Sequence, residues 1–106
     1  MYASVTSVRT AEADLDLTAT LAAESLVDWL RQFEGYRGML VFSSEDDGCA
    51  QFITFWDSAE ALRRTEQSRS ELRMQLIETG GAELEGVQAY AVVHVDGLDL
   101  RPAESA

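Results

Sequence analysis

Few side chains in this 106-residue sequence are suited to chemistry. It has one histidine, His94, and one cysteine, Cys49. A single histidine excludes a metal site built from several imidazoles, and no carboxylate spacing resembles a calcium-binding loop. Cys49 follows Asp46 and Asp47, whose negative charge disfavours a thiolate, and a lone cysteine cannot form an internal disulfide. No acidic or nucleophilic neighbour accompanies His94 in the sequence. We therefore expect no metal and no cofactor, with Cys49 a bystander and His94 structural.

The charged residues exclude several classes of partner. Eight arginines and no lysine stand against nineteen acidic residues, which gives a formal net charge of −11. So acidic a surface repels nucleic-acid phosphates and anionic lipid, and the dispersed arginines form no basic stripe. No apolar run approaches the ~20 residues that span a bilayer. The N-terminal segment lacks the pattern of a secretory signal. We expect a cytoplasmic protein that binds neither nucleic acid nor membrane.

The elements that must position any site are clearest between Tyr36 and Trp56. Two extended apolar runs flank a turn that ends in Asp47-Gly48, a dipeptide typical of hairpins. The second run, residues 52–56, is apolar at nearly every position. A half-exposed antiparallel strand would alternate instead. We therefore expect this strand to be covered on both faces.

The flanking segments complete a β-α-β-β-α-β order. Residues 2–8 predict a strand, and residues 17–33 predict a helix with one apolar stripe, capped by Asp14 or Asp16 and followed by Gly35. Capping-box spacing at Asp57–Glu60 recurs at Ser68–Glu71, so the second helical region is expected in two pieces, 58–66 and 69–78, ended by Gly80-Gly81. Residues 87–95 alternate and predict the last strand. Its two alternating rows are Val87, Ala89, Ala91, Val93 and Val95, and Gln88, Tyr90, Val92 and His94.

This order predicts an α+β, ferredoxin-like fold in which a four-stranded antiparallel sheet carries both helices on one face. One domain is expected over residues 1–97, with a flexible tail at 98–106. The helix-free face, to which the last strand can contribute its Val/Ala row, still needs cover. A bare apolar face of this size is rare on a monomer, so we expect a symmetric homodimer.

Two motifs resemble those of the antibiotic biosynthesis monooxygenase (ABM) family. Phe33–Gly38 is similar to the family's "PGF-x-G" entry to the second strand. Phe55–Ala61 is similar to its "W-E-S-x-E-A" step from the third strand into the second helix. The resemblance covers about residues 2–97. It implies a dimeric α+β barrel with a pocket in each subunit between the sheet and the helices.

One branch of this family degrades haem. The Asn, Trp and His that those members use fall near Ser7, Thr65 and Met74, and none of the three matches. Haem degradation is therefore unlikely by this comparison.

Another branch resembles cofactor-free oxygenases that convert phenols or anthrones to quinones. Its Trp corresponds to Trp56, and its "S-x-E-L-R" arginine corresponds to Arg73. Its Asn and Tyr positions hold Phe52 and Leu62 instead, so two of four polar contributors differ. The resemblance implies Trp56 and Arg73 as catalytic residues.

Cofactor-free oxidation of a phenol requires that the substrate ionise, that its anion be stabilised and that water be excluded. A guanidinium such as that of Arg73 stays charged and can bind an oxygen pair. The indole of Trp56 can donate one hydrogen bond and stack on a planar ring. No general base is evident, so a water or the substrate's own acidity would serve. The expected pocket residues are Phe52, Thr54, Leu62, Leu72, Leu76 and Ser7.

Simpler interpretations exist for the same residues. An arginine on a helix is most often solvated, and a tryptophan at a strand end is most often core or interface. Three hypotheses follow: an ABM-like monooxygenase acting on a small aromatic or polyketide-type substrate, a non-catalytic ligand-binding or structural dimer of the same fold, and, as an outsider, haem degradation.

Overall fold

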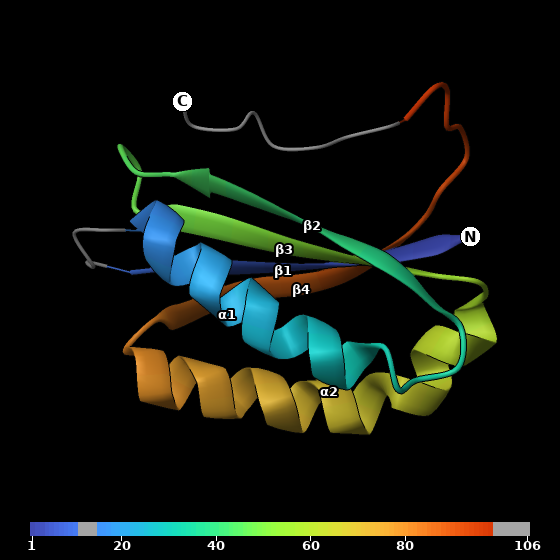
Figure 1. Ribbon diagram of the computed structural model, residues 1–106, viewed down its shortest axis with the longest axis horizontal. Helices are drawn as coiled ribbons and strands as arrows, with labels where there is room; N and C mark the ends of the chain where they lie inside the picture. The colour runs from blue at the N-terminus through green and yellow to red at the C-terminus, as the bar shows by residue number, and fades with distance from the viewer. Residues whose placement is uncertain (11–14, 99–106) are drawn as a thin grey trace.

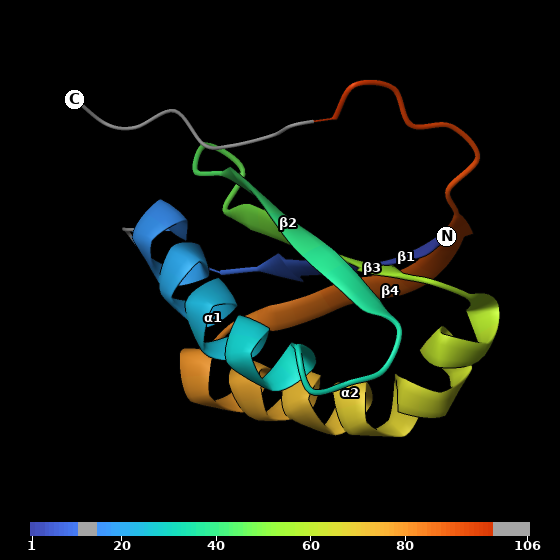
Figure 2. The same cartoon turned by 45° about the vertical axis from the view of Figure 1, so that its right-hand side comes forward.

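The computed structural model describes residues 1–10 and 15–98, apart from the side chains of residues 76, 79 and 80. Its elements are β1 (Tyr2–Arg9), α1 (Leu15–Leu30), β2 (Tyr36–Ser44), β3 (Cys49–Trp56), α2 (Ala59–Gly80) and β4 (Glu83–Ala91). The four strands form one antiparallel sheet in the order β2-β3-β1-β4. Figures 1 and 2 show both helices on the same face of it. The predicted α+β, ferredoxin-like fold is confirmed.

The hairpin between β2 and β3 forms where Asp47-Gly48 predicts it. Asp47 N–H donates to Ser44 O at 3.2 Å, and Gly48 N–H donates to Glu45 O at 3.2 Å. Gly48 has φ +66, a left-handed conformation that a residue without a Cβ adopts at little cost. β3 lies between β2 and β1. Ala50, Phe52 and Thr54 line the space under the helices, and Ile53 is buried on the other face, where Gln51 is exposed.

The second helical region is one continuous helix, so the prediction of two pieces is wrong. Ser58, one residue later than the predicted Asp57, is the N-cap and accepts from Ala61 N–H at 3.1 Å. Gly81 ends the helix at φ +68. Ser68 is exposed within the helix, whereas Thr65 and Arg69 in the same turns are buried. The repeated cap-like spacing therefore has no structural role.

The last strand begins and ends four residues earlier than predicted. Pairing stops at Ala91 because its partner Tyr2 begins β1, and Val92 N–H then donates to Met1 O at 2.9 Å. His94 therefore lies outside the sheet. Ala89 pairs with Ser4, whose side chain contacts α2, so the predicted placement of the Val/Ala row on the helix-free face is wrong. Val87, Ala89 and Ala91 face the helices.

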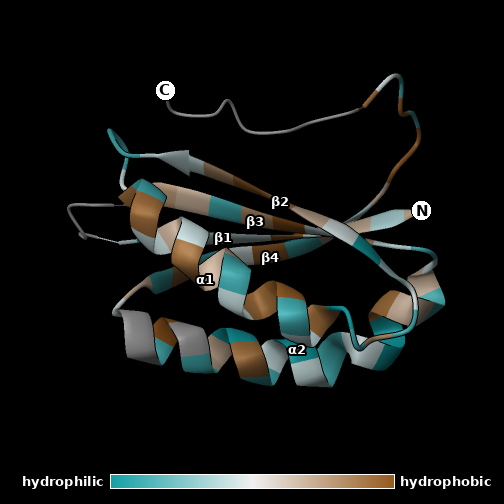
Figure 3. Cartoon of the chain, viewed as in Figure 1, coloured by the Kyte–Doolittle hydropathy of each residue, from teal (hydrophilic) through white to brown (hydrophobic). Residues whose placement is uncertain are grey.

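α1 starts two residues earlier and ends three residues earlier than predicted. Leu30 is its last residue, and Phe33 follows in a turn whose N–H donates to Leu30 O at 3.0 Å. Figure 3 shows hydrophobic and hydrophilic bands alternating along both helices, as expected of amphipathic helices that cover a sheet. Neither helix has the length and apolar composition of a membrane span.

The helix-free face keeps exposed apolar groups. Phe42 is 53% exposed and Tyr90 is 49% exposed, although Ala3 and Ile53 between them are buried. After Ala91 the chain turns to the side of the sheet away from the helices, where Val93 is 91% exposed (Figures 1 and 2). The predicted tail of residues 98–106 lies, beyond Leu98, outside the described residues.

Candidate active site

A cavity of about 250 Å³ lies between the sheet and the two helices. A single water needs only ~10–15 Å³ of such volume, so the space suits an organic ligand. Strand alternation positions its floor, because residues two apart on β1 and on β3 point to the same face. The floor comprises Ser4, Thr6 and Val8 from β1, Met39 from β2, and Ala50, Phe52 and Thr54 from β3. The helices contribute, among others, Leu26, Trp29 and Leu30 from α1, and Arg69, Leu72, Arg73 and Ile77 from α2.

The polar groups of this wall share one electrostatic character. Its described residues include hydroxyls and two guanidinium groups, those of Arg69 and Arg73, but no carboxylate. An apolar cavity of low dielectric strengthens the attraction of these cations for an anion. The arrangement therefore favours an apolar ligand that carries a negative or partly negative oxygen.

Arg73 lines the cavity from α2 and is half-buried. Burial lowers the pKa of its guanidinium, an effect that the charge of Glu66 opposes. No described residue accepts a hydrogen bond from it. Because arginine stays protonated at working pH, its N–H groups are available to a ligand.

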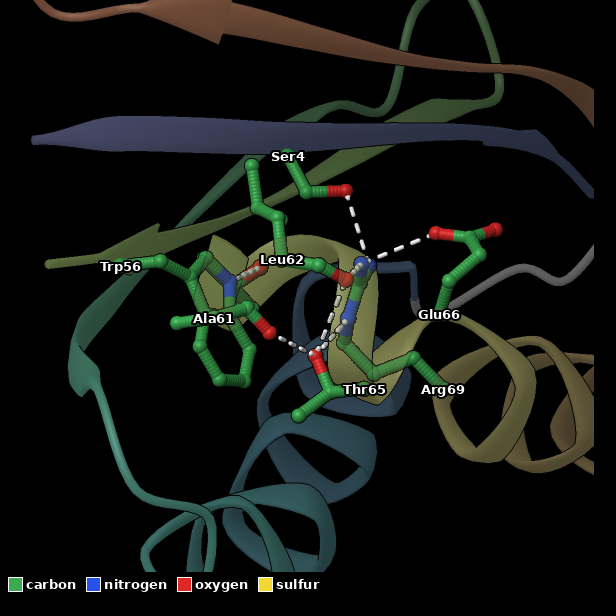
Figure 4. Close-up of polar contacts among 8 residues, drawn as sticks. Ser4, Trp56, Ala61, Leu62, Thr65, Glu66 and Arg69 are labelled. Atoms are coloured by element: carbon green, nitrogen blue, oxygen red, sulfur yellow. Dashed lines mark hydrogen bonds and ion pairs between the residues drawn. The ribbon is translucent and has the colours of Figure 1, made fainter. Parts of the chain in front are cut away.

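Arg69, one helical turn before Arg73, is only 6% exposed and has four acceptors (Figure 4). Nε donates to Thr65 Oγ1 at 2.9 Å, and Nη1 donates to Ser4 Oγ at 3.3 Å. Nη2 donates to Leu62 O at 2.8 Å and Glu66 Oε2 at 2.9 Å. Burial lowers the pKa of Arg69, Glu66 raises it and Arg73 lowers it further.

Sequence reasoning missed Arg69. The signal was available, because Leu62, Thr65, Arg69 and Leu72 recur at steps of three and four, which places them on one helix face. An arginine inside such a row lies on the buried side. The repeated capping-box spacing obscured this by dividing the helix at the same point.

Trp56 is fully buried, at 0% exposure, and does not line the cavity. Its ring makes an edge contact with Tyr36, and the Arg69 guanidinium carbon lies 5.3 Å from its centroid. Its indole N–H donates to Thr54 Oγ1 at 2.9 Å. Trp56 thus has the packing role that large aromatic residues usually have, and it contacts two cavity-lining residues, Thr54 and Arg69.

The other expected pocket residues divide into three groups. Phe52, Thr54 and Leu72 line the cavity. Leu62 packs in the buried cluster around Trp56. Ser7 lies on the opposite face of the sheet, where its hydroxyl accepts from Gln51 Nε2 at 3.2 Å, and the side chain of Leu76 is outside the described set.

The cysteine and the acidic residues form no second centre. Burial raises the pKa of the Cys49 thiol, Arg9 opposes this effect, and nearby Glu85 and Asp47 raise the pKa further. The described residues contain no group of three or more side chains placed to bind a metal ion.

The fold is similar to those of several solved structures described as monooxygenases. An antibiotic biosynthesis monooxygenase homologue from Deinococcus radiodurans superposes with a TM-score of 0.65 and 17% identity, over 92% of this chain and 98% of that one. The ActVA-Orf6 monooxygenase of Streptomyces coelicolor, solved with nanaomycin D, gives 0.63 and 19%, over 92% and 89%.

SnoaB, a cofactor-independent oxygenase from Streptomyces nogalater solved as a variant, gives a TM-score of 0.61 at 11% identity, over 89% of this chain and 95% of that one. At these identities the likeness establishes the fold. No protein-family model matches the sequence, and no curated protein matches it.

Proposed function

We propose that this protein is an ABM-type, cofactor-independent monooxygenase that oxidises a small aromatic or polyketide-type substrate with molecular oxygen. The observation that carries the proposal is the apolar cavity. Its described wall holds no carboxylate, and it holds Arg73, which has no hydrogen-bond acceptor among the described residues. The fold that it shares with ActVA-Orf6 and SnoaB supports it.

The proposed chemistry begins with ionisation of the bound substrate. Arg73 stabilises the anion in the largely apolar cavity, and the electron-rich anion then reacts with oxygen. In an anthrone, the methylene carbon becomes a carbonyl. One oxygen atom enters the product, and the other leaves as water with the two methylene hydrogens. The proton leaves to a bound water, because the described wall holds no carboxylate or histidine.

Trp56 acts in this scheme as a positioning residue. Its N–H occupies one acceptor site of Thr54 Oγ1. The hydrogen of the Thr54 hydroxyl is then left to donate elsewhere, and Thr54 lines the cavity. Trp56 thereby orients a hydroxyl toward a ligand oxygen without touching the ligand itself.

The proposal includes a homodimer. Phe42 and Tyr90 on the helix-free face, and Val93 after β4, expose apolar surface that an identical copy would cover. Light scattering at micromolar concentration should give about twice the chain mass of 11.7 kDa. A stable monomer would remove this part of the proposal.

Oxygen uptake with anthrone tests the activity. The wild-type protein should consume oxygen and yield anthraquinone without added flavin or metal, and Arg73→Gln should abolish most of the rate. Arg64→Gln is the matched control, because Arg64 is exposed on the same helix and does not line the cavity. Equal rates in both variants would remove Arg73 from the mechanism.

The second candidate function is ligand binding without turnover in the same cavity. The observation that favours it is the lack of a carboxylate or imidazole base among the described wall residues. Tight binding of anthraquinone, with no oxygen uptake on any anthrone or hydroquinone, would favour this alternative.

A further inference from the structure

We propose that Ser4 and Arg69 form a two-donor site for an anionic ligand oxygen at the inner wall of the cavity. This inference rests on the proposed function, because it assigns a position to the anion that the reaction forms. Arg73 supplies one cation to the cavity. The Ser4–Arg69 pair supplies a second, preorganised one from residues outside the "S-x-E-L-R" arginine position.

The hydrogen-bond inventory of Arg69 leaves one donor unused. A guanidinium has five N–H groups. Nε uses its single hydrogen on Thr65, and Nη2 uses both on Leu62 O and Glu66. Nη1 uses one of its two hydrogens on Ser4. One Nη1 hydrogen therefore has no acceptor among the described residues, and Nη1 is the nitrogen that donates to Ser4 of β1.

Ser4 supplies the second donor. Its oxygen accepts from Arg69 Nη1, so its own hydroxyl hydrogen is left to donate. Ser4 is only 4% exposed, on the central part of β1. Both Ser4 and Arg69 line the cavity, and both also line an adjoining groove between α2 and β4. The two donors thus lie together at the boundary between the two spaces.

The surroundings hold this pair in place before a ligand arrives. Arg69 is fixed by its protein acceptors and lies over the Trp56 ring, so little reorganisation is needed to receive an anion. Glu66, with 58% of its side chain exposed, balances one positive charge from the groove side. Arg73 adds a second charge, so the wall stays cationic. Figure 4 shows Ser4 and Arg69 approaching each other from the sheet and from α2.

The ligand class that this site fits is an apolar aromatic acid of the phenol type. The protein carries a net charge of −11, which disfavours the approach of permanent anions. A phenol can enter the cavity in its neutral form. It can then lose its proton beside the Ser4 and Arg69 donors and the positive charges of Arg69 and Arg73. Such a site stabilises the bound phenolate relative to the phenol.

Umbelliferone is a suitable probe, because its neutral and anionic forms absorb at different wavelengths. The pKa of the probe bound to the wild-type protein should fall by about one unit or more below its value in water, a tenfold change in ionisation constant. Ser4→Ala should reverse part of that fall, and Arg69→Gln most of it. Ser68→Ala and Arg64→Gln, exposed positions on α2, are the matched controls and should titrate as wild type.

The result that overturns the site is a bound-probe pKa in Ser4→Ala and Arg69→Gln equal to that of the wild type, or no binding of umbelliferone by the wild-type protein. Circular dichroism checks folding. If Arg69→Gln does not fold, Ser4→Ala and Arg69→Lys decide. If the Ser4 and Arg69 variants lose the pKa shift and the wild-type protein oxidises no anthrone, the two-donor site stands and the proposed oxygenase activity is wrong. Normal anthrone oxidation by the Ser4 and Arg69 variants removes the site and keeps the oxygenase.

Discussion

The space between the sheet and the helices has two ends that differ in how fully they are packed. At one end Trp56 is completely buried among Leu30, Ala61 and Leu62, and its N–H has an acceptor. At the other end α1 and α2 leave the cavity of about 250 Å³. Arg73 lines it, and no residue in the described part of the chain accepts a hydrogen bond from Arg73. A second buried cluster, Leu15, Ala19 and Ala50, also borders this cavity. Both ends therefore contribute to the core, but only the cavity end leaves space for a ligand.

Two arginines one helical turn apart show the same contrast. Arg69 has four protein acceptors and lies against Trp56, so it belongs partly to the packed end. Arg73 belongs to the open end. Substitutions in α2 should therefore separate stability from ligand binding according to which end they touch.

The largest effect should come from Trp56→Ala. Removing a fully buried indole costs about 3–5 kcal/mol of unfolding free energy through lost burial and the remaining cavity. Urea unfolding followed by circular dichroism measures it. Trp56→Phe, which keeps most of the ring, should lose less. A cost under about 1 kcal/mol for Trp56→Ala would show that this end is not the packed one.

Arg73→Gln should have the opposite profile. We expect kcat/KM for anthrone to fall about a hundredfold, as when one preorganised oxyanion donor is removed. The free energy of unfolding should change by less than about 0.5 kcal/mol, because no described residue accepts a hydrogen bond from Arg73. A large loss of stability with unchanged turnover would reverse the assignment of Arg73 to the open end.

Leu62→Ala and Leu72→Ala compare the two ends directly on one helix. Leu62 is 7% exposed within the Trp56 cluster, and its truncation should cost about 2–5 kcal/mol. Leu72 borders an existing cavity, so its truncation should cost about 1 kcal/mol. Thermal or urea unfolding of both variants gives the difference. Equal costs would mean that the cavity end is packed as tightly as the other.

A modest effect should come from Ser58→Ala at the start of α2, beside the packed end. Ser58 Oγ accepts from Ala61 N–H at 3.1 Å, and loss of an N-cap costs about 1 kcal/mol. Asp57→Ala is the informative comparison, because Asp57 pairs with Arg37 at 2.8 Å on the surface and should cost less. If Asp57→Ala cost more than Ser58→Ala, Asp57 would be the N-cap, as the sequence spacing predicts.

Local signals in the sequence were sufficient for the element order and the hairpin. Asp47-Gly48 encodes its own turn, and the apolar run through Phe55 encodes a central strand. The end of β4 depends instead on where β1 begins, which no residue of β4 encodes. Residues an odd number of positions apart on a strand point to opposite faces, so Ser7, three residues after Ser4, lies on the opposite face.

The site was predictable only in part for a related reason. Arg73 was expected from the resemblance to the ABM family, and Phe52 and Leu72 were expected as apolar wall residues. All three line the cavity. The role of Arg69 depends on Ser4 and Glu66, of which Ser4 is distant in sequence. Trp56 was expected to contact substrate, but its burial depends on how α1 and α2 close over it.

The most direct test is a crystal structure of the protein with bound anthraquinone. We expect the rings to fill the cavity between the sheet and the helices, with a carbonyl oxygen within about 3 Å of an Arg73 nitrogen. Anthraquinone on the helix-free face, or in the cavity with Arg73 turned toward solvent, would contradict the division between a packed end and a ligand-binding end.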